Sequence, residues 1–257
     1  MAIRFPDHWK NIRSLAEGGQ AWTFLVHDTN SQTDEEFVLK ILKNHDRIGR
    51  FRHEVDAIRK LNHPNIVSIV DADLEAENPY FVTEYCAGGS LDKATPFWRN
   101  SPLEALDLFE QICVGLVCAH SNSIIHRDIK PGNIFLRSET GPAVLGDFGL
   151  CFLQDDPERL THTQEAVGAR QYMAPELEDG KLDDVTDKCD IYSLGKLLYW
   201  LLSPDGKLFS REKYRDQQWD LKRWNVENPQ RWDNIYMEHA NRLLDLMVVT
   251  DPRALLK

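Results

Sequence analysis

The spacing of apolar residues divides the chain into a first part rich in strands and a second part rich in helices. Residues 9–26 predict a strand, a glycine turn and a second strand, and the nearly continuous apolar run at 36–42 suits a strand with both faces largely covered. From about residue 47 to 61 the apolar residues recur every three or four positions, which predicts an amphipathic helix. Residues 66–86 predict two further strands around a polar loop at 76–78.

The pair Gly88-Gly89 marks the change in pattern and is a candidate boundary between two lobes. Beyond it, Ser101-Pro102-Leu103-Glu104 is a capping box with proline at the first helical position, and the apolar period predicts a helix to about Ser121. Apolar runs at 134–136 and 143–145 predict a small hairpin.

The remaining chain adds helices at 187–202 and from 238 to about 249. The whole pattern predicts an α+β, bilobal fold. A small, mainly β amino-terminal lobe with one key helix covers about 9–86, and a larger, mainly α lobe covers about 87–253. Crevices between lobes are common ligand sites.

Length, cysteine content and net charge exclude several classes of protein and of partner. The 257 residues contain no run of 18 apolar residues, and the first residues lack the apolar core of a signal peptide. The five cysteines form no close C-x-x-C pair, so we expect neither a disulfide framework nor a zinc site, and we expect a cytoplasmic protein without a membrane partner. A formal net charge of −11 argues against nucleic acid as a partner.

The densest chemistry lies in the stretch from His126 to Asn133, between the helix ending near Ser121 and the first strand of the hairpin. Within it, the carboxylate of Asp128 can accept a proton from a hydroxyl, and Lys130 can neutralise a phosphate. The amide oxygen of Asn133 can hold a metal ion. These are the groups that phosphoryl transfer needs.

Three other segments add to this chemistry. Lys40 lies inside a strand with both faces largely apolar, where an unpaired ammonium is costly, and Glu54 in the following helix is its best candidate partner. An edge strand with Lys40 reaching water is the alternative. The hairpin is expected to return Asp147 to the side of Asp128. The glycine turn at 16–21 suits either phosphate binding or a plain hairpin, and taken alone it favours the hairpin.

Together these motifs resemble a eukaryotic-type Ser/Thr protein kinase catalytic domain, over roughly Trp9 to Arg253, and they are also similar to bacterial members. The glycine loop, Lys40, Glu54 and the loop 126–133 appear in the family's order. The order continues with Asp147-Phe148-Gly149, Ala174-Pro175-Glu176 and Asp190-Ile191-Tyr192-Ser193-Leu194-Gly195.

The resemblance implies one protein kinase domain over 1–257 that transfers the γ-phosphoryl group of ATP to Ser or Thr hydroxyls of a protein substrate and also phosphorylates itself. Asp128 would accept the hydroxyl proton, and Lys130 would steady the γ-phosphoryl group. Lys40, paired with Glu54, would hold the α- and β-phosphates. Asn133 and Asp147 would bind Mg²⁺, with Mn²⁺ as an alternative ion. The implied nucleotide-binding residues are Leu15, Gly18, Gly19, Val38, Lys40, Thr83, Glu84, Cys86 and Phe135.

Other residues bear on regulation. The resemblance implies that Arg127 pairs with a phosphate on the segment 150–172, where Thr161 and Thr163 are candidate sites beside the alternative of plain exposed threonines. Glu165 occupies the position where many relatives carry the phosphorylated residue. If its carboxylate replaces a phosphate, Glu165→Ala should lower activity, and unchanged activity would refute this hypothesis.

Two departures from the family pattern carry consequences. Gly168-Ala169 replaces the usual Gly-Thr, so a hydrogen bond to the catalytic Asp and Lys is lost and we expect reduced but retained activity. Leu255 stands where the family has an Arg that pairs with Glu176, and Arg253 is the nearest substitute. Breaking such a buried pair costs about 3–5 kcal/mol. An altered or shortened end is the other explanation, and further domains in a longer natural protein are then expected.

Two other functions remain open. In one, the chain is a pseudokinase that acts as a nucleotide-binding interaction module, which the alanines at 16, 21 and 169 favour. Against it, Lys40, Asp128, Asn133 and Asp147 are all present. In the other, the chain is a small-molecule phosphotransferase of related fold. The segment 174–176 and the helix that contains Asp190 argue against this, because the family uses them to build a platform for protein substrates.

Overall fold

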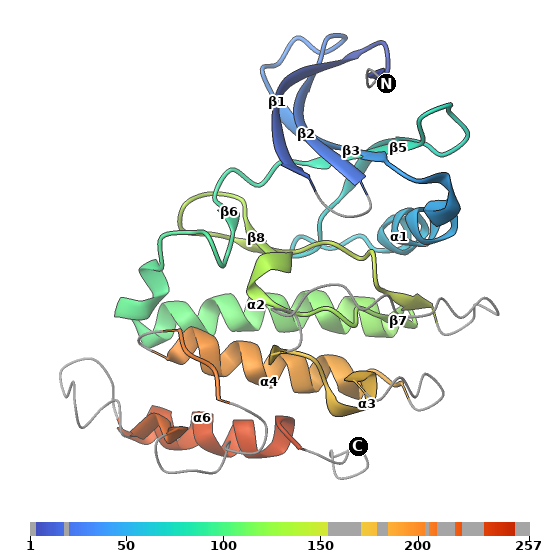
Figure 1. The fold of residues 1–257 in the computed structure, drawn as a ribbon. Helices are drawn as coiled ribbons and strands as arrows, with labels where there is room; N and C mark the ends of the chain where they lie inside the picture. Colours follow the sequence, from blue (N-terminus) through green and yellow to red (C-terminus); the bar gives the residue numbers. More distant parts are fainter. Residues whose placement is uncertain are drawn as a thin grey trace.

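The computed structural model describes residues 4–17, 21–153, 171–178, 185–203, 206–209, 219–222 and 234–249. Its amino-terminal region is a five-stranded antiparallel sheet in the order β1-β2-β3-β5-β4 (Figure 1). The strands are β1 (Trp9–Glu17), β2 (Ala21–Asp28), β3 (Glu36–Leu42), β4 (Ile69–Asp73) and β5 (Tyr80–Glu84). The predicted strands of this region are therefore confirmed.

β3 lies in the middle of the sheet, which rules out the edge-strand alternative for Lys40. Leu39 and Ile41 are fully buried on one face, as expected for a central strand. The helix α1 (Ile48–Lys60) packs beside this sheet and buries Phe51, Glu54 and Val55. The expected bounds of 47–61 differ from the observed helix by one residue at each end.

The carboxy-terminal region is mainly helical, as predicted. Its helices are α2 (Pro102–Ser121), α3 (Pro175–Glu178), α4 (Lys188–Leu202) and α6 (Asn234–Met247). Pro102 is the first residue of α2, and the Ser101 hydroxyl accepts a hydrogen bond from the Glu104 backbone N–H at 3.4 Å, so the predicted cap is present. The last helix begins at Asn234, four residues before the expected start.

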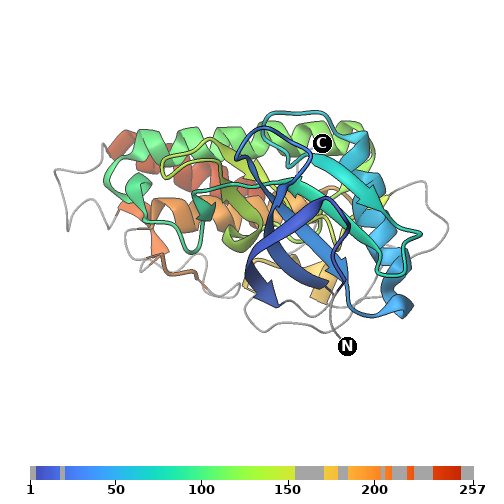
Figure 2. The same cartoon turned by 90° about the horizontal axis from the view of Figure 1, so that it is seen from above.

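Short strands join the two regions. β6 (Gly89–Ser90), β8 (Ile134–Leu136) and β9 (Ala143–Leu145) form one sheet, in which β8 and β9 are the predicted hairpin. β7 (Ile124–Ile125) pairs with β10 (Phe152–Leu153). β6 and β8 lie between the large sheet and the helices, whereas β7 lies beside α2 (Figure 1). Seen from above, the large sheet overlies only one part of the helical region (Figure 2).

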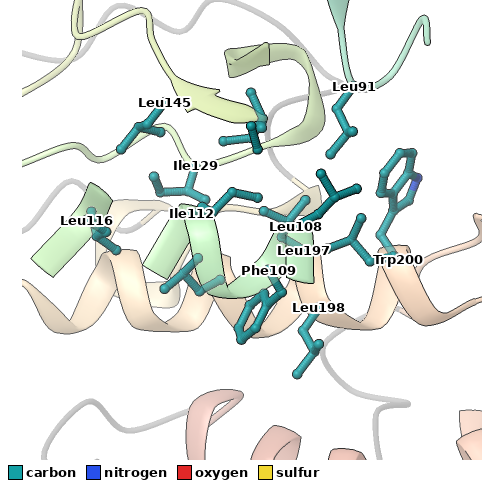
Figure 3. Packing of buried hydrophobic residues seen from close by; sticks show 14 of the residues in the cluster. Leu91, Leu108, Phe109, Ile112, Leu116, Ile129, Leu145, Leu197, Leu198 and Trp200 are labelled. Carbon is teal, nitrogen blue, oxygen red and sulfur yellow. The ribbon is translucent and has the colours of Figure 1, made fainter. Parts of the chain in front are cut away.

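The largest apolar core lies in the helical region. Figure 3 shows Leu108 and Ile112 of α2 close to Leu197 of α4, with Ile129 and Leu145 above them. Smaller clusters hold the large sheet and α1 together. Among the described residues, no helix has both the length and the apolar character that crossing a membrane requires. The core fixes α2 and α4 as the base on which the loop between β7 and β8 rests.

Candidate active site

The loop between β7 and β8 is anchored from below by a carboxylate of α4. Asp190 is fully buried and accepts hydrogen bonds from the backbone N–H groups of His126 at 2.8 Å and Arg127 at 2.7 Å. The imidazole Nε2 of His120, on α2, lies 2.8 Å from the same carboxylate. Arg127 has a positive φ of 68°, a conformation that costs energy and needs such support.

Asp128 lies at the centre of the polar groups that this loop presents. The Lys130 Nζ donates to its Oδ2 at 2.5 Å, and the Asn133 Nδ2 donates to Oδ2 and to the backbone carbonyl of Asp128, both at 2.8 Å. The side chain of Asp128 is 12% exposed. The structure therefore brings together the three residues that the sequence singled out first.

Lys40 reaches from the large sheet to two carboxylates. Its Nζ lies 2.8 Å from Glu54 Oε1 on α1 and 3.4 Å from Asp147 Oδ1, which follows β9. The Lys40–Glu54 pair expected from sequence is thus present. Because Asp147 belongs to the other region of the fold, Lys40 links the two regions at this point.

Charge and burial set the ionisation of this triad. Burial alone would lower the pKa of Lys40, but the carboxylates of Glu54 and Asp147 outweigh it and raise that pKa, so the ammonium stays charged. Burial raises the pKa of Glu54, against the opposing attraction of Lys40. The Lys40 cation lowers the pKa of Asp147, whose side chain is 45% exposed and carries its negative charge at neutral pH.

His126 connects the loop to the segment that contains Asp147. Its Nε2 lies 3.1 Å from the carbonyl oxygen of Gly146, and its ring packs on Phe148 with centroids 4.7 Å apart. Asp147 itself has a positive φ of 59°. Backbone strain of this kind persists where the surroundings hold it, and here it directs the Asp147 carboxylate toward Lys40.

Asn133 and Asp147 suit a hard divalent cation. The Asn133 amide nitrogen is occupied by Asp128, which leaves its oxygen Oδ1 as a ligand, and Asp147 offers an ionised carboxylate. Oxygen donors of this kind are the ones that Mg²⁺ prefers. Within the described residues, no group of three His, Cys, Asp or Glu side chains forms a metal site. The oxygen donors of Asn133 and Asp147 are therefore a set that fits Mg²⁺.

The expected nucleotide-binding residues lie on the elements around this site. Val38 of β3 pairs with Thr83 of β5, and Thr83 is buried. The carbonyl of Cys86 accepts a hydrogen bond from Gly89 N–H at 2.9 Å, so the chain turns immediately after β5. Phe135 of β8 lies so close to Gly146 that a Cβ there would be 2.9 Å from its ring. Leu15 lies on β1, partly buried.

Several expectations fall outside the described part of the chain. These are Gly18 and Gly19 of the glycine loop, Thr161, Thr163 and Glu165, Gly168 and Ala169, and Arg253 and Leu255. Glu176 lies within the described part of the chain, where it is buried and interacts with a partner.

Sequence reasoning missed three contributors to the site. Asp190 was noted only as part of a motif, and His120 was not singled out. Arg137, directly after β8, was also not singled out, although its guanidinium binds the Glu84 carboxylate at 2.8 Å and 3.0 Å. A charged residue at the end of an apolar strand was the available signal for Arg137. For Asp190 the signal was an acid in an apolar helix.

Comparison with known proteins agrees with this geometry. Residues 9–254 match the protein kinase domain family. The chain is 35% identical over 250 residues to serine/threonine-protein kinase PrkC of Bacillus subtilis, covering 91% of this chain and 37% of that protein. It is 38% identical over 213 residues to serine/threonine-protein kinase PknB of Mycobacterium leprae, covering 77% of this chain and 33% of that protein.

A third relative is serine/threonine-protein kinase Pkn1 of Myxococcus xanthus, 35% identical over 204 residues, with 75% of this chain and 28% of that protein covered. The chain thus spans about a third of the length of these curated relatives. The family match covers nearly all of the chain, and the mainly β and helical regions observed here are those of a bilobal kinase fold. The chain therefore belongs to the protein kinase domain family.

Proposed function

We propose that this chain is the catalytic domain of a Ser/Thr protein kinase that transfers the γ-phosphoryl group of ATP to protein hydroxyls. One observation carries the proposal: Lys40 contacts Glu54 and Asp147 while Asp128, Lys130 and Asn133 form one hydrogen-bonded cluster. The side chains proposed for phosphoryl transfer are therefore brought together in one arrangement. The relatives named above are all serine/threonine-protein kinases, which supports the same substrate class.

In this mechanism Asp128 orients the substrate hydroxyl and accepts its proton as the hydroxyl oxygen bonds to the γ-phosphorus. The bond between that phosphorus and the β–γ bridging oxygen breaks, and ADP leaves. Lys130, hydrogen-bonded to Asp128, places a positive charge beside the transferred group and offsets its negative charge. Lys40 holds the α- and β-phosphates, and its contact with Glu54 fixes the ammonium in place. The chemistry depends on positioning and charge rather than on a covalent enzyme intermediate.

Mg²⁺, or Mn²⁺ in its place, would be held by Asn133 and Asp147. When bound, the ion supplies positive charge that neutralises the phosphate oxygens. For the adenine ring, we propose the backbone of Glu84 and Cys86 as the binding edge, with Thr83 behind it. Leu15, Val38 and Phe135 would enclose the ring, and Gly18 and Gly19 would cover the phosphates.

We also propose that the whole chain is one kinase domain, with lobes at about 9–86 and 87–253, that phosphorylates itself as well as other proteins. All five cysteines are free thiols, which supports a reducing, cytoplasmic location. Control by phosphorylation at Thr161 or Thr163 through Arg127, and further domains in a longer natural protein, belong to the same proposal.

A transfer assay tests the proposal against its two alternatives. The chain is incubated with Mg²⁺ and γ-labelled ATP, with a generic protein substrate, with a metabolite mixture, or alone, beside Asp128→Ala. A kinase labels protein on Ser or Thr, and Asp128→Ala loses on the order of 10²–10⁴ in rate. Transfer to metabolites alone would support the small-molecule phosphotransferase. ATP binding without any transfer would support the pseudokinase.

A further inference from the structure

An ion pair outside the catalytic cluster also joins the two regions of the fold. Arg137 donates from Nε to Glu84 Oε2 at 2.8 Å and from Nη2 to Glu84 Oε1 at 3.0 Å. Its third nitrogen, Nη1, donates to the backbone carbonyl of Pro64, in the segment between α1 and β4. A planar guanidinium that binds both oxygens of one carboxylate is among the strongest and most directional of ion pairs.

Glu84 is held from its other side by Ser68. The Ser68 backbone N–H and hydroxyl both lie 3.0 Å from Glu84 Oε1, and the Glu84 N–H donates to the Ser68 carbonyl at 3.2 Å. The side chains of Glu84 and Arg137 are 20% and 32% exposed. Partial burial alone would raise the pKa of Glu84, but the bonds from Arg137 and Ser68 outweigh it and lower that pKa. We refer to Glu84, Ser68 and Arg137 as the clamp.

The clamp lies at the end of β5, where the segment that follows β5 contacts β8. Gly88 N–H donates to the Leu136 carbonyl at 2.9 Å, and Leu91 N–H donates to the Ile134 carbonyl at 2.8 Å. A Cβ at Gly88 would lie only 2.1 Å from the Ser138 carbonyl oxygen, so this segment already sits against the end of β8. The clamp adds a side-chain link just before this backbone contact.

We propose that Arg137 is a positioning residue for nucleotide binding, which it performs by fixing Glu84 relative to β8. The inference rests on the proposed function, because the backbone of Glu84 is part of the proposed adenine-binding edge. The clamp occurs together with the Lys40–Glu54 and Lys40–Asp147 contacts, so it belongs to the arrangement in which the catalytic groups are assembled.

The clamp and the catalytic cluster do not share a side chain. Without Arg137, the end of β5 loses its side-chain link to the end of β8 and keeps the backbone contact at Gly88, so it is held less firmly against Phe135 and the grip on the adenine ring weakens. Asp128, Lys130 and Asn133 keep their mutual hydrogen bonds, because those bonds involve no clamp residue. Loss of Arg137 therefore acts on nucleotide affinity and leaves the chemical step nearly unchanged.

Steady-state kinetics on the full chain with Mg²⁺–ATP tests this. We expect Arg137→Ala to raise the KM for ATP about 5- to 20-fold, with kcat within about twofold of the parent. Arg137→Lys keeps the charge but not the fork, so it should recover part of the loss. Because Glu84→Gln and Arg137→Ala break the same link, the double variant should be no worse than Arg137→Ala alone.

Arg242→Ala is the matched control, since it removes an exposed arginine that binds Glu238 within α6, and its KM should equal that of the parent. Calorimetric titration with Mg²⁺–ATP tests the role of the clamp in nucleotide binding independently of whether the chain transfers phosphate. If the parent binds ATP but transfers nothing, the Kd ratio of Arg137→Lys to the parent still tests the clamp. The proposal for Arg137 would be overturned if Arg137→Ala and Arg137→Lys both bound ATP as tightly as the parent. A rise in kcat, or a parent that binds no ATP, would also overturn it.

Discussion

At the scale of single residues, the site depends on groups that hold other groups in place. Asp190 contacts no reacting atom, yet it binds the backbone of His126 and Arg127 directly before Asp128. Arg137 likewise acts on Glu84 from a different element. The positive φ of Arg127 and of Asp147 shows where the backbone depends on such support. The conformation of the proposed catalytic residues is therefore set largely by their neighbours.

Replacing Asp190 tests this dependence. Asp190→Ala leaves buried N–H groups of residues 126 and 127 without their acceptor, so we expect a loss of about 3–5 kcal/mol in unfolding free energy. Asp190→Asn keeps one acceptor oxygen and should lose clearly less. Urea denaturation measures both, with the exposed Asp107→Ala on α2 as the control within about 0.5 kcal/mol of the parent. Equal stability of parent and Asp190→Ala would contradict the anchoring role.

At the scale of elements, β3, α1 and β8 position the site by their packing against neighbours. β3 lies centrally in the large sheet, and α1 presents Glu54 to it. After β5, the chain contacts β8 at Gly88, whose N–H donates to the Leu136 carbonyl. These contacts depend on close approach, so the space available at a single atom determines whether an element can keep its place.

Two glycines provide a matched pair for this point. At Gly88 a new Cβ would lie 2.1 Å from the Ser138 carbonyl oxygen, which is backbone and cannot rotate away. Gly88→Ala should therefore lower unfolding free energy by about 2–3 kcal/mol. At Gly49, in α1, nothing lies within 4 Å, so Gly49→Ala should raise it by up to about 1 kcal/mol. Thermal and urea unfolding measure both variants. If both substitutions raised, or both lowered, the unfolding free energy, the packing argument would be refuted.

The clamp between β5 and β8 also predicts a pH dependence. The pKa of Glu84 is lowered in the folded chain, so its stabilisation is complete above the unfolded-state value of about 4.3 and is lost as pH falls through the folded value. At pH 7 we expect Glu84→Gln to be about 0.5–1 kcal/mol less stable than the parent, because the pair is partly exposed.

Urea unfolding from about pH 7 down to about pH 2 checks this, since the gap between parent and Glu84→Gln should hold above about pH 4.3 and narrow below it. A gap of constant size would show that the Glu84 charge contributes nothing to stability.

At the scale of the whole molecule, the two regions meet through apolar packing, in which Ile58 of α1 belongs to the same cluster as Leu116 and Leu145, and through specific polar contacts. Lys40 reaches Asp147, and Glu84 binds Arg137. A third link runs through the backbone, where Val67 N–H donates to the Leu145 carbonyl at 2.9 Å and Leu145 N–H donates to the Asn65 carbonyl at 2.8 Å. These links cross between the sheet and the helical region that Figure 1 shows above and below one another.

Whether the sequence predicts a contact depends on how far apart in the sequence its two partners lie. The Lys40–Glu54 pair followed from the cost of burying a lone ammonium, and the β8–β9 hairpin followed from two short apolar runs close together in the sequence. Arg137 and Glu84 are 53 positions apart, and Arg127 and Asp190 are 63 apart, so no local pattern shows either contact.

Element boundaries failed for a different reason. The start of α6 was placed too late because the exposed Ile235 and Tyr236 obscure its apolar period. The short strands β7 and β10 contain two residues each and exist only because they pair with each other. Both depend on tertiary contacts rather than on local sequence.

The central claim is that Asp128 serves phosphoryl transfer from ATP to a protein hydroxyl, and a single-turnover measurement tests it most directly. Parent and Asp128→Asn are loaded with Mg²⁺ and γ-labelled ATP, bound nucleotide is quantified, and labelled Ser or Thr in protein is followed over time. We predict similar ATP binding in both and transfer slower by about 10²–10⁴ in Asp128→Asn. Equal transfer rates in the two proteins, or ATP bound by the parent without any labelled Ser or Thr, would contradict it.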